Sequence, residues 1–280
     1  GDFMAQITLN DISLRDYDLT ERVSNLKKNY FKSMPEICAE RPRLITQFHL
    51  KNNLLGKQRI SILDKARAYR YSLERRVPIV RHKRAYKKGM KAFKFKDNNL
   101  FAGSTTSKFK GVPLYPEFLA LALWPELWTI SERENNPYHI TEAEVKELNY
   151  RIFPYWIENT ILELARKRSF VENLKEVGRK NFAPEIKLLE GLVFFMASKP
   201  NCISHTIPDF SRAIKLGLRN IIDEAQAKAG QTSDDFQKEF YNAISEVLEG
   251  IIAYSKNMAA KAEELANKES DPVLKEELLD

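Results

Sequence analysis

The sequence predicts a mainly α protein with only a few short strands. At least six segments space their apolar residues three and four positions apart, as one face of an amphipathic helix does. Only two short segments qualify as candidate strands, Asn99–Ala102 and Cys202–Thr206. Hydrophobic residues make up 43% of the 280 residues, which suffices for a sizeable core. We therefore expect a globular chain in which helices supply most of the packing.

Three helices are predicted in the first part of the chain, with no strand between them. Apolar residues over Asp16–Met34 have helical spacing, and Pro35 stops that segment. A second helix begins near Pro42 and runs toward Gly56, and a third covers Ser61–Arg76, where Pro78 ends it. The prolines separate the helices because proline removes a backbone donor and restricts the residue before it.

Further helices follow in the middle of the chain. Thr141 and Glu144 have the spacing of a capping box, in which each side chain satisfies the backbone donor of the other. The helix that begins there is expected to kink at Pro154, because proline removes a donor from the helical ladder. Pro184–Ala197 has the pattern of another helix.

The last two predicted helices lie toward the end of the sequence. One begins near Pro208 and Asp209, where proline suits the first turn and a carboxylate suits the positive end of the helix dipole. The other is the longest periodic run in the chain, from Phe236 to Leu265. Thr232 or Ser233 is the expected cap of this long helix.

The net charge of +7 is unevenly distributed. Residues 51–100 contain 16 lysines and arginines but only three acidic residues, a local balance of +13. Their aromatic residues have helical spacing and accompany no recognised nucleic-acid motif, so we favour a solvated helix face or a subunit contact. An acidic protein partner is the next interpretation, and nucleic-acid binding the last.

The sequence lacks the common signatures of enzymes that bind nucleotides or zinc or that use a serine nucleophile. No P-loop, no GxGxxG after a strand, no HExxH and no GxSxG occurs in it. Two cysteines without a CxxC pair fit a reducing compartment. No signal-peptide pattern and no apolar run of about 18 residues is present. We therefore expect a cytoplasmic protein that neither enters a membrane nor binds nucleic acid.

The stretch from Leu100 to Trp156 is the most distinctive part of the sequence. It contains all three tryptophans and a loop with glycine and hydroxyl residues, followed by an apolar segment from Glu117 to Trp128. That segment has few charges, so we expect a helix covered on most sides. The order of these features suggests a loop held over a site, where Ser104, Thr105 and Thr106 are able to donate to a carboxylate. Hydroxyl-rich turns are also common without such a role.

The sequence of this stretch resembles the N-terminal region of glycyl radical enzymes, the pyruvate formate-lyase superfamily. The similarity is carried by the glycine loop with Gly103 and Gly111, and by Tyr115–Phe118 and Leu123–Leu127, which look most like arylacetate decarboxylases acting on 4-hydroxyphenylacetate or indoleacetate. It continues through His205–Asp209 and Leu265–Glu269, and so covers nearly the whole chain. Tyr254–Lys256 departs from the Arg-Tyr of many relatives, which weakens the subgroup assignment but not the superfamily.

The resemblance implies that residues 1–280 are the N-terminal helical portion of an α/β barrel enzyme whose core and glycine-radical domain lie elsewhere. The catalytic cysteine and the radical glycine of the family have no match in this chain. An inert fragment of a radical decarboxylase that forms p-cresol or skatole is therefore expected. Another glycyl radical lyase, such as a diol dehydratase, choline lyase or formate acetyltransferase-like enzyme, is the alternative, as is a non-catalytic helical interaction module.

The resemblance also implies the partners of the full enzyme. These are the rest of the same polypeptide, a second copy in a homodimer, an iron-sulfur radical-SAM activase that installs the glycyl radical, and a small iron-sulfur subunit. It implies no bound cofactor and no metal in this chain.

His205 and Asp209 are the candidate substrate-binding residues. They lie where an apparent strand ends and a helix begins, and in the family the matching His-x-x-x-Asp borders the substrate chamber. The alternative is that Asp209 caps its helix while His205 binds a neighbouring carbonyl. Cys202 lies three residues before His205, but no second Cys/His pair supports a metal site or a nucleophile. We expect Cys202 to be a neutral, buried cysteine instead.

Overall fold

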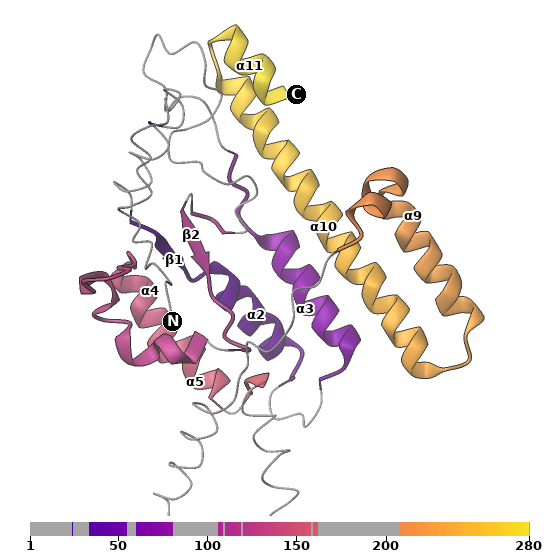
Figure 1. The fold of residues 1–280 in the computed structure, drawn as a ribbon, viewed down its shortest axis with the longest axis horizontal. Coiled ribbons are helices and arrows are strands. Elements are labelled where there is room, and N and C mark those ends of the chain that lie inside the picture. Colours follow the sequence, from indigo (N-terminus) through magenta and orange to yellow (C-terminus); the bar gives the residue numbers. More distant parts are fainter. Residues whose placement is uncertain are drawn as a thin grey trace, which may run out of the picture.

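The computed structural model consists of helices arranged side by side around one small sheet (Figure 1). The structure describes Ser24 and residues 34–54, 60–80, 106–108, 110–118, 120–157, 159–161 and 208–279. Apart from Ser24, which is helical, and Met34, which is not, the predicted helix Asp16–Met34 falls outside these residues, as do the predictions for Asn99–Ala102, Pro184–Ala197 and Cys202–Thr206. Within the described part, the mainly α prediction is confirmed, since two strands of three residues each accompany the helices.

The sheet pairs β1 (Glu36–Cys38) with β2 (Gly111–Pro113) in parallel, with Ile37 opposite Val112. A single bridge from Glu36 to His139 extends the pairing on the other side of β1. The prediction of no strand between the first helical segments was wrong. β1 is three residues long, and its partners lie about seventy or more positions away, so no local period marks it.

Two helices follow β1 and pack against each other. α2 (Glu40–Lys51) begins two residues before the predicted Pro42, which lies in its first turn. α3 (Ile62–Arg75) agrees with the predicted helix, and the side chain of Ser61 accepts a hydrogen bond from the backbone N–H of Asp64 at 3.0 Å. This N-cap satisfies one of the free donors at the start of the helix.

The apolar segment between Glu117 and Trp128 is not the predicted covered α-helix. It forms the 3₁₀ helix η3 (Ala120–Glu126), with Pro125 inside it, and a second 3₁₀ turn follows, η4 (Ile130–Glu132). Leu127 and Ile130 are buried, but Trp128 is 51% exposed. Pro125 cannot donate to an α-helical ladder, so the chain takes a tighter turn here, and the buried Leu127 and Ile130 are three residues apart.

The capping box predicted at Thr141 and Glu144 is confirmed, with both reciprocal hydrogen bonds present at the start of α4 (Glu142–Glu147). A π-helical segment, η5 (Leu148–Ile152), comes next and leads into α5 (Phe153–Trp156). The expected irregularity therefore exists, but it precedes Pro154. Proline lacks the N–H that an α-helical register would use, and the wider π turn accommodates this.

The last helices form an antiparallel pair with a short return. α9 (Phe210–Gln231) begins at the predicted place, and α10 (Asp235–Lys268) is the predicted long helix. Its cap is Asp234 rather than Thr232 or Ser233, because the Asp234 carboxylate accepts from the N–H of Gln237 at 2.8 Å. α11 (Pro272–Leu279) folds back along the end of α10 (Figure 1).

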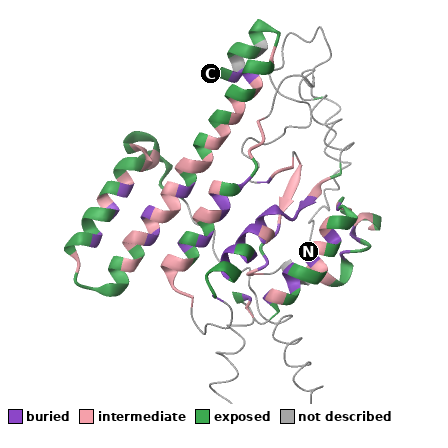
Figure 2. Cartoon of the chain, turned by 180° about the vertical axis from the view of Figure 1, so that it is seen from behind, coloured by how far each residue is buried: buried purple, intermediate pink, exposed green. Residues whose placement is uncertain are grey.

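The elements form a row in which α3 lies between α2 and α10, while α9 lies on the outer side of α10 (Figure 1). The main core lies at the other end of the row, where α2, η3, η4, α4 and α5 meet, and Trp156 and Phe153 are its largest fully buried side chains. Figure 2 shows the same contrast, with buried residues concentrated on α2 and mostly exposed residues on α9 and α11.

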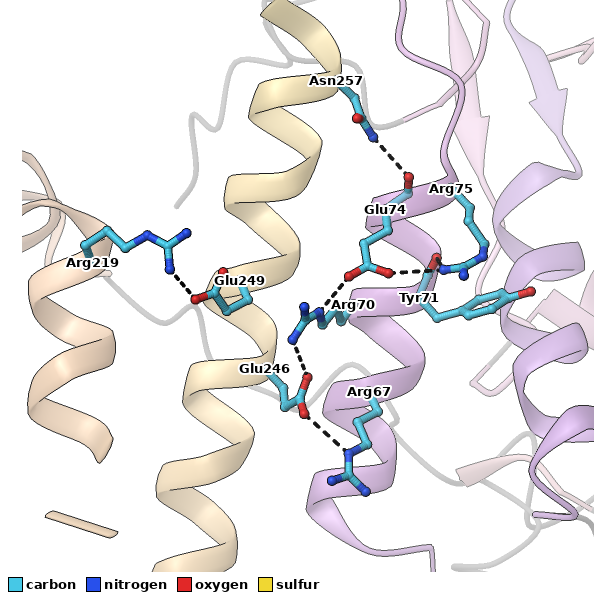
Figure 3. A network of polar contacts seen from close by, with 9 residues as sticks. All are labelled: Arg67, Arg70, Tyr71, Glu74, Arg75, Arg219, Glu246, Glu249 and Asn257. Carbon is cyan, nitrogen blue, oxygen red and sulfur yellow. Dashed lines mark hydrogen bonds and ion pairs between the residues drawn. The ribbon is translucent and has the colours of Figure 1, made fainter. Parts of the chain in front are cut away.

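Ion pairs join α3 to α10. Arg67 and Arg70 both reach Glu246, at 3.4 Å and 2.9 Å, and the side-chain amide of Asn257 donates to the carbonyl of Glu74 at 3.0 Å (Figure 3). Arg219 of α9 pairs with Glu249 on another face of α10. Arginines from the basic stretch 51–100 therefore hold helices of this chain together, rather than forming only a solvated face.

Candidate functional site

Residues 106–108 and 110–118, which include β2, form the anchored loop, and Arg41 fastens it to the start of α2. One guanidinium nitrogen of Arg41 donates to the carbonyl of Leu114 and to Oε2 of Glu117, both at 3.1 Å, and the other pairs with Oε1 of the same carboxylate. The guanidinium carbon also lies 4.0 Å from the centre of the Tyr115 ring. Arg41 is buried, so these contacts offset the loss of hydration of its charge.

Lys108 fastens the other side of the loop. Its ammonium donates to the carbonyl of Ile37 at 2.7 Å and to the carboxylate of Glu144 at 2.8 Å, and Glu36 lies 3.9 Å away. Burial opposes ionisation of Glu144, but the hydrogen bonds from Lys108 and Thr141 outweigh it and lower the pKa of Glu144. The capping-box carboxylate thus joins α4, β1 and the loop through one charged contact.

Thr106 and Gly111 set the shape of the turn around Lys108, where the chain enters β2. The Thr106 hydroxyl donates to the Lys108 carbonyl at 2.8 Å and accepts from the Lys108 N–H at 3.3 Å. A Cβ atom at position 111 would lie 1.9 Å from the Thr106 hydroxyl oxygen, so this position requires glycine. Thr106 therefore serves a turn, while Ser104 and Thr105 lie outside the described residues.

An aromatic cluster lies where α2 meets α5. The indole N–H of Trp156 donates to the Thr46 hydroxyl at 2.9 Å, and the ring centres of His49 and Trp156 are 4.8 Å apart. Burial lowers the pKa of His49, although Glu117 and Asp64 oppose the shift. Burial also raises the pKa of Tyr155 to about 12. We did not predict this cluster from the sequence, where a histidine among apolar helix residues is its only signal.

The predicted site residues are only partly placed. Asp209 is exposed and acts as the N-cap of α9, accepting from the N–H of Arg212 at 3.0 Å. His205 and Cys202 lie outside the described residues, so the predicted substrate-binding role of His205 and Asp209 stays a prediction. Cys38 is buried, with its sulfur 3.3 Å from the Ser107 hydroxyl oxygen, and the expected burial of Cys202 stays a prediction.

An open groove of about 400 Å³ lies between α3 and α10. Its lining is apolar apart from Lys65, and consists of Ile62, Lys65, Ala66, Tyr69, Phe240, Ala243, Ile244, Val247 and Leu248. Most of this lining is aliphatic or aromatic, as in sites that bind apolar groups.

The charged contacts of Arg41 and Lys108 anchor parts of the described chain to one another. Arg41 and Lys108 are each held by a carboxylate and a backbone carbonyl. No group of histidine, cysteine and acidic side chains able to hold a metal ion occurs among the residues that the structure describes. Over the same residues, no helix is both long and apolar enough to cross a bilayer.

Comparison with known proteins identifies the family to which the chain belongs. The model of the family described as "Pyruvate formate lyase-like" matches residues 18–280. The (2S)-3-sulfopropanediol dehydratase of Klebsiella oxytoca is 26% identical over 272 residues, which cover 94% of this chain and 29% of that protein. The isethionate sulfite-lyase of Desulfovibrio desulfuricans is 28% identical over 172 residues, covering 59% of this chain and 20% of that protein.

A solved structure matches over nearly the whole chain. The crystal structure of a glycyl radical enzyme from Archaeoglobus fulgidus superposes with a TM-score of 0.67 at 22% identity, covering 92% of this chain and 30% of that one. The chain thus spans about three tenths of the length of such relatives. It belongs to the pyruvate formate lyase-like family, and its mainly α fold is that of the N-terminal region of a glycyl radical enzyme.

Proposed function

We propose that the chain is the N-terminal part of a glycyl radical lyase and that it supplies the helical support for the catalytic part of that enzyme. The family match along residues 18–280 carries this proposal. The anchored loop supports it, because Arg41 and Lys108 bind carboxylates and backbone carbonyls of the chain itself. In this proposal the chain alone is inactive, and the catalytic cysteine and radical glycine lie in the rest of the polypeptide.

For the whole enzyme we favour an elimination reaction on a small hydroxylated or sulfonated substrate. The names of the two relatives support this choice, since a dehydratase removes water and a sulfite-lyase releases sulfite. The anchored loop and the buried aromatic cluster do not discriminate one leaving group from another.

Decarboxylation of 4-hydroxyphenylacetate or indoleacetate, giving p-cresol or skatole, is the second candidate. It is favoured by the sequences of Tyr115–Phe118 and Leu123–Leu127, which resemble those of arylacetate decarboxylases. In the structure these segments contain the Glu117 that pairs with Arg41 and the 3₁₀ turn η3. The ion pair and the turn are structural features, so the case for a decarboxylase rests on the resemblance.

The proposed enzyme works with partners that this chain does not contain. A radical-SAM activase with an iron-sulfur cluster would install the glycyl radical, and the enzyme would act as a cytoplasmic homodimer. A small iron-sulfur subunit is part of the proposal only for the decarboxylase candidate.

The coding sequence beyond Asp280 gives the first test. An open reading frame with a cysteine loop and an R-V-x-G-(Y/F/W) type glycine motif is the expected result. A stop codon directly after Asp280 would contradict the enzyme proposal and favour a non-catalytic helical interaction module.

The second test is activation of the full-length protein under anoxic conditions with its activase. Electron paramagnetic resonance is expected to show a glycyl radical. The activated protein is then offered 3-sulfopropanediol, isethionate, propane-1,2-diol and 4-hydroxyphenylacetate separately. Release of sulfite or loss of water supports the elimination, p-cresol formation selects the second candidate, and a radical without turnover of any substrate contradicts both.

A further inference from the structure

The first turns of α9 carry large apolar side chains that the rest of the described chain leaves uncovered. Phe210 is 66% exposed, Ile214 is 82% exposed and Leu216 is 50% exposed. We call these three side chains the α9 apolar patch. They belong to one short segment, Phe210–Leu216, which directly precedes a break in the helix at Gly217.

The break separates this segment from the remainder of α9. Gly217 has φ 76° and ψ 159°, a conformation that is essentially restricted to glycine. Arg212 pairs with Glu224 beyond the break, so a polar contact holds the segment against the second part of the helix. The charge of Arg212 is thereby paired within α9, whereas the side chains of the α9 apolar patch remain exposed.

A segment this short does not maintain a helix through its own hydrogen bonds. Isolated helices shorter than about 12 residues are marginal in water, and helical stability in proteins comes mainly from burial of an apolar face. Since the described residues leave that face open, another part of the protein is needed to cover it. From this we propose that the α9 apolar patch docks onto the polypeptide that follows Asp280 in the full-length enzyme, an inference that rests on the proposed function.

The size of the patch favours a segment of the same polypeptide over a second copy of the chain. Three side chains expose on the order of a few hundred Å², whereas a stable interface between proteins buries about 800 Å² on each partner. Covalent linkage removes that requirement, because a tethered segment meets the patch at a high effective concentration. The relatives also extend far beyond the part that matches this chain, which supplies the necessary length.

The test compares site-specific labelling in the 280-residue chain and in the full-length enzyme. Ile214→Cys places a thiol in the patch, and Lys215→Cys places one at the next residue, whose side chain is exposed and polar. A maleimide reagent with peptide mass spectrometry measures each rate separately from those of Cys38 and Cys202. We expect labelling at position 214 to slow by roughly tenfold or more in the full-length enzyme, as a buried site does, and labelling at position 215 to change little.

Equal labelling rates at position 214 in the two proteins would overturn the proposal. If labelling at position 214 slows in the 280-residue chain as the protein concentration rises, a second copy of the chain covers the patch, and the proposal is overturned. Hydrogen exchange of residues 210–216 in the unsubstituted proteins gives the same comparison without a mutation. A stop codon after Asp280 would overturn the proposed function and this docking together, whereas open labelling in an active full-length enzyme would overturn the docking alone.

Discussion

Gly250 of α10 lies directly against the backbone of Arg70 in α3. A Cβ atom at position 250 would stand 2.9 Å from the Cα atom of Arg70 and 3.2 Å from a methyl carbon of Leu73. The absence of a side chain at Gly250 therefore lets the two helices cross closely. Around this point the ion pairs of Arg67 and Arg70 with Glu246 join the same two helices (Figure 3).

Substitution of Gly250 by alanine is expected to destabilise the chain, because one of the two backbones must move. The cost should be about 1–3 kcal/mol, as for other additions to a closely packed contact. Gly230→Ala is the matched control, since nothing lies within 4 Å of that position, and alanine is expected to stabilise the helix by up to about 1 kcal/mol. Urea denaturation measures both, and a stabilising Gly250→Ala would contradict the close crossing.

The pair between Arg41 and Glu117 gives a second prediction. Arg41→Leu or Glu117→Leu leaves the partner charge without its counter-ion, and each should cost about 3 kcal/mol, the lower end of the range for a broken buried pair, because Glu117 is 25% exposed. The double variant should lose much less than the sum of the two. Glu142→Gln, which breaks the exposed pair with Lys146, is expected to leave the urea midpoint unchanged. Strictly additive losses would show that the two charges do not depend on each other.

His49 predicts how stability depends on pH. Burial lowers the pKa of His49 in the folded chain below its ordinary value of 6.5, so the unfolded chain binds more protons in the interval between the two pKa values. Stability is therefore complete above pH 6.5 and falls as the pH decreases through that interval. Urea denaturation between about pH 5 and 7.5 lies above the titration of ordinary carboxylates and measures the slope.

His49→Gln should flatten this dependence, because the substituted residue does not titrate. His139→Gln, at an exposed histidine outside the aromatic cluster, is the control and should keep the slope of the unsubstituted chain. If His49→Gln retained the full slope, another group would be responsible for it.

Two caps set by neighbouring residues could be predicted from the sequence, whereas pairing between distant residues could not. The capping box needs only Thr141 and Glu144, three positions apart, and the cap of α3 needs only Ser61. β1 was missed because its pairing with β2 depends on residues about seventy positions away. The apolar segment before Trp128 was misassigned because its composition resembles that of a buried helix, while Pro125 imposes a 3₁₀ turn.

The candidate site shows the same limit. Arg41 and Glu117 are 76 positions apart, and no local pattern connects them. The available signal was a charged residue at the start of an apolar helix, since an arginine buried there requires a partner. The resemblance to glycyl radical enzymes indicated which segments matter, but only the structure shows that Glu117 anchors the loop.

Gly217→Ala tests whether the break in α9 is required. Alanine at φ 76° and ψ 159° is strained by about 1–3 kcal/mol, and no neighbouring atom within 4 Å adds a steric term. We expect a loss of stability of that order by urea denaturation. A gain like that of Gly230→Ala would instead show that α9 runs straight through position 217, because alanine then acts as an ordinary helix former.

Asp209 is the candidate site residue whose two roles can be separated. As the N-cap of α9, it accepts from the N–H of Arg212, and asparagine fills this position about equally well. Asp209→Ala should therefore cost about 0.5–2 kcal/mol of stability, while Asp209→Asn should cost little. If Asp209 also positions substrate in the full-length enzyme, Asp209→Asn should lower turnover, because small errors of placement cost rate heavily.

The two substitutions, together with His205→Ala, are compared on the same preparations of the activated full-length enzyme. Melting temperature reports the cap, electron paramagnetic resonance reports the radical yield, and product formation reports the substrate role. Reduced turnover of Asp209→Asn and His205→Ala, with unchanged melting temperature and radical yield, would place both residues at the substrate. Normal turnover of Asp209→Asn, with a loss of stability only in Asp209→Ala, would limit Asp209 to its cap, because the neutral amide keeps the hydrogen bond while it removes the charge.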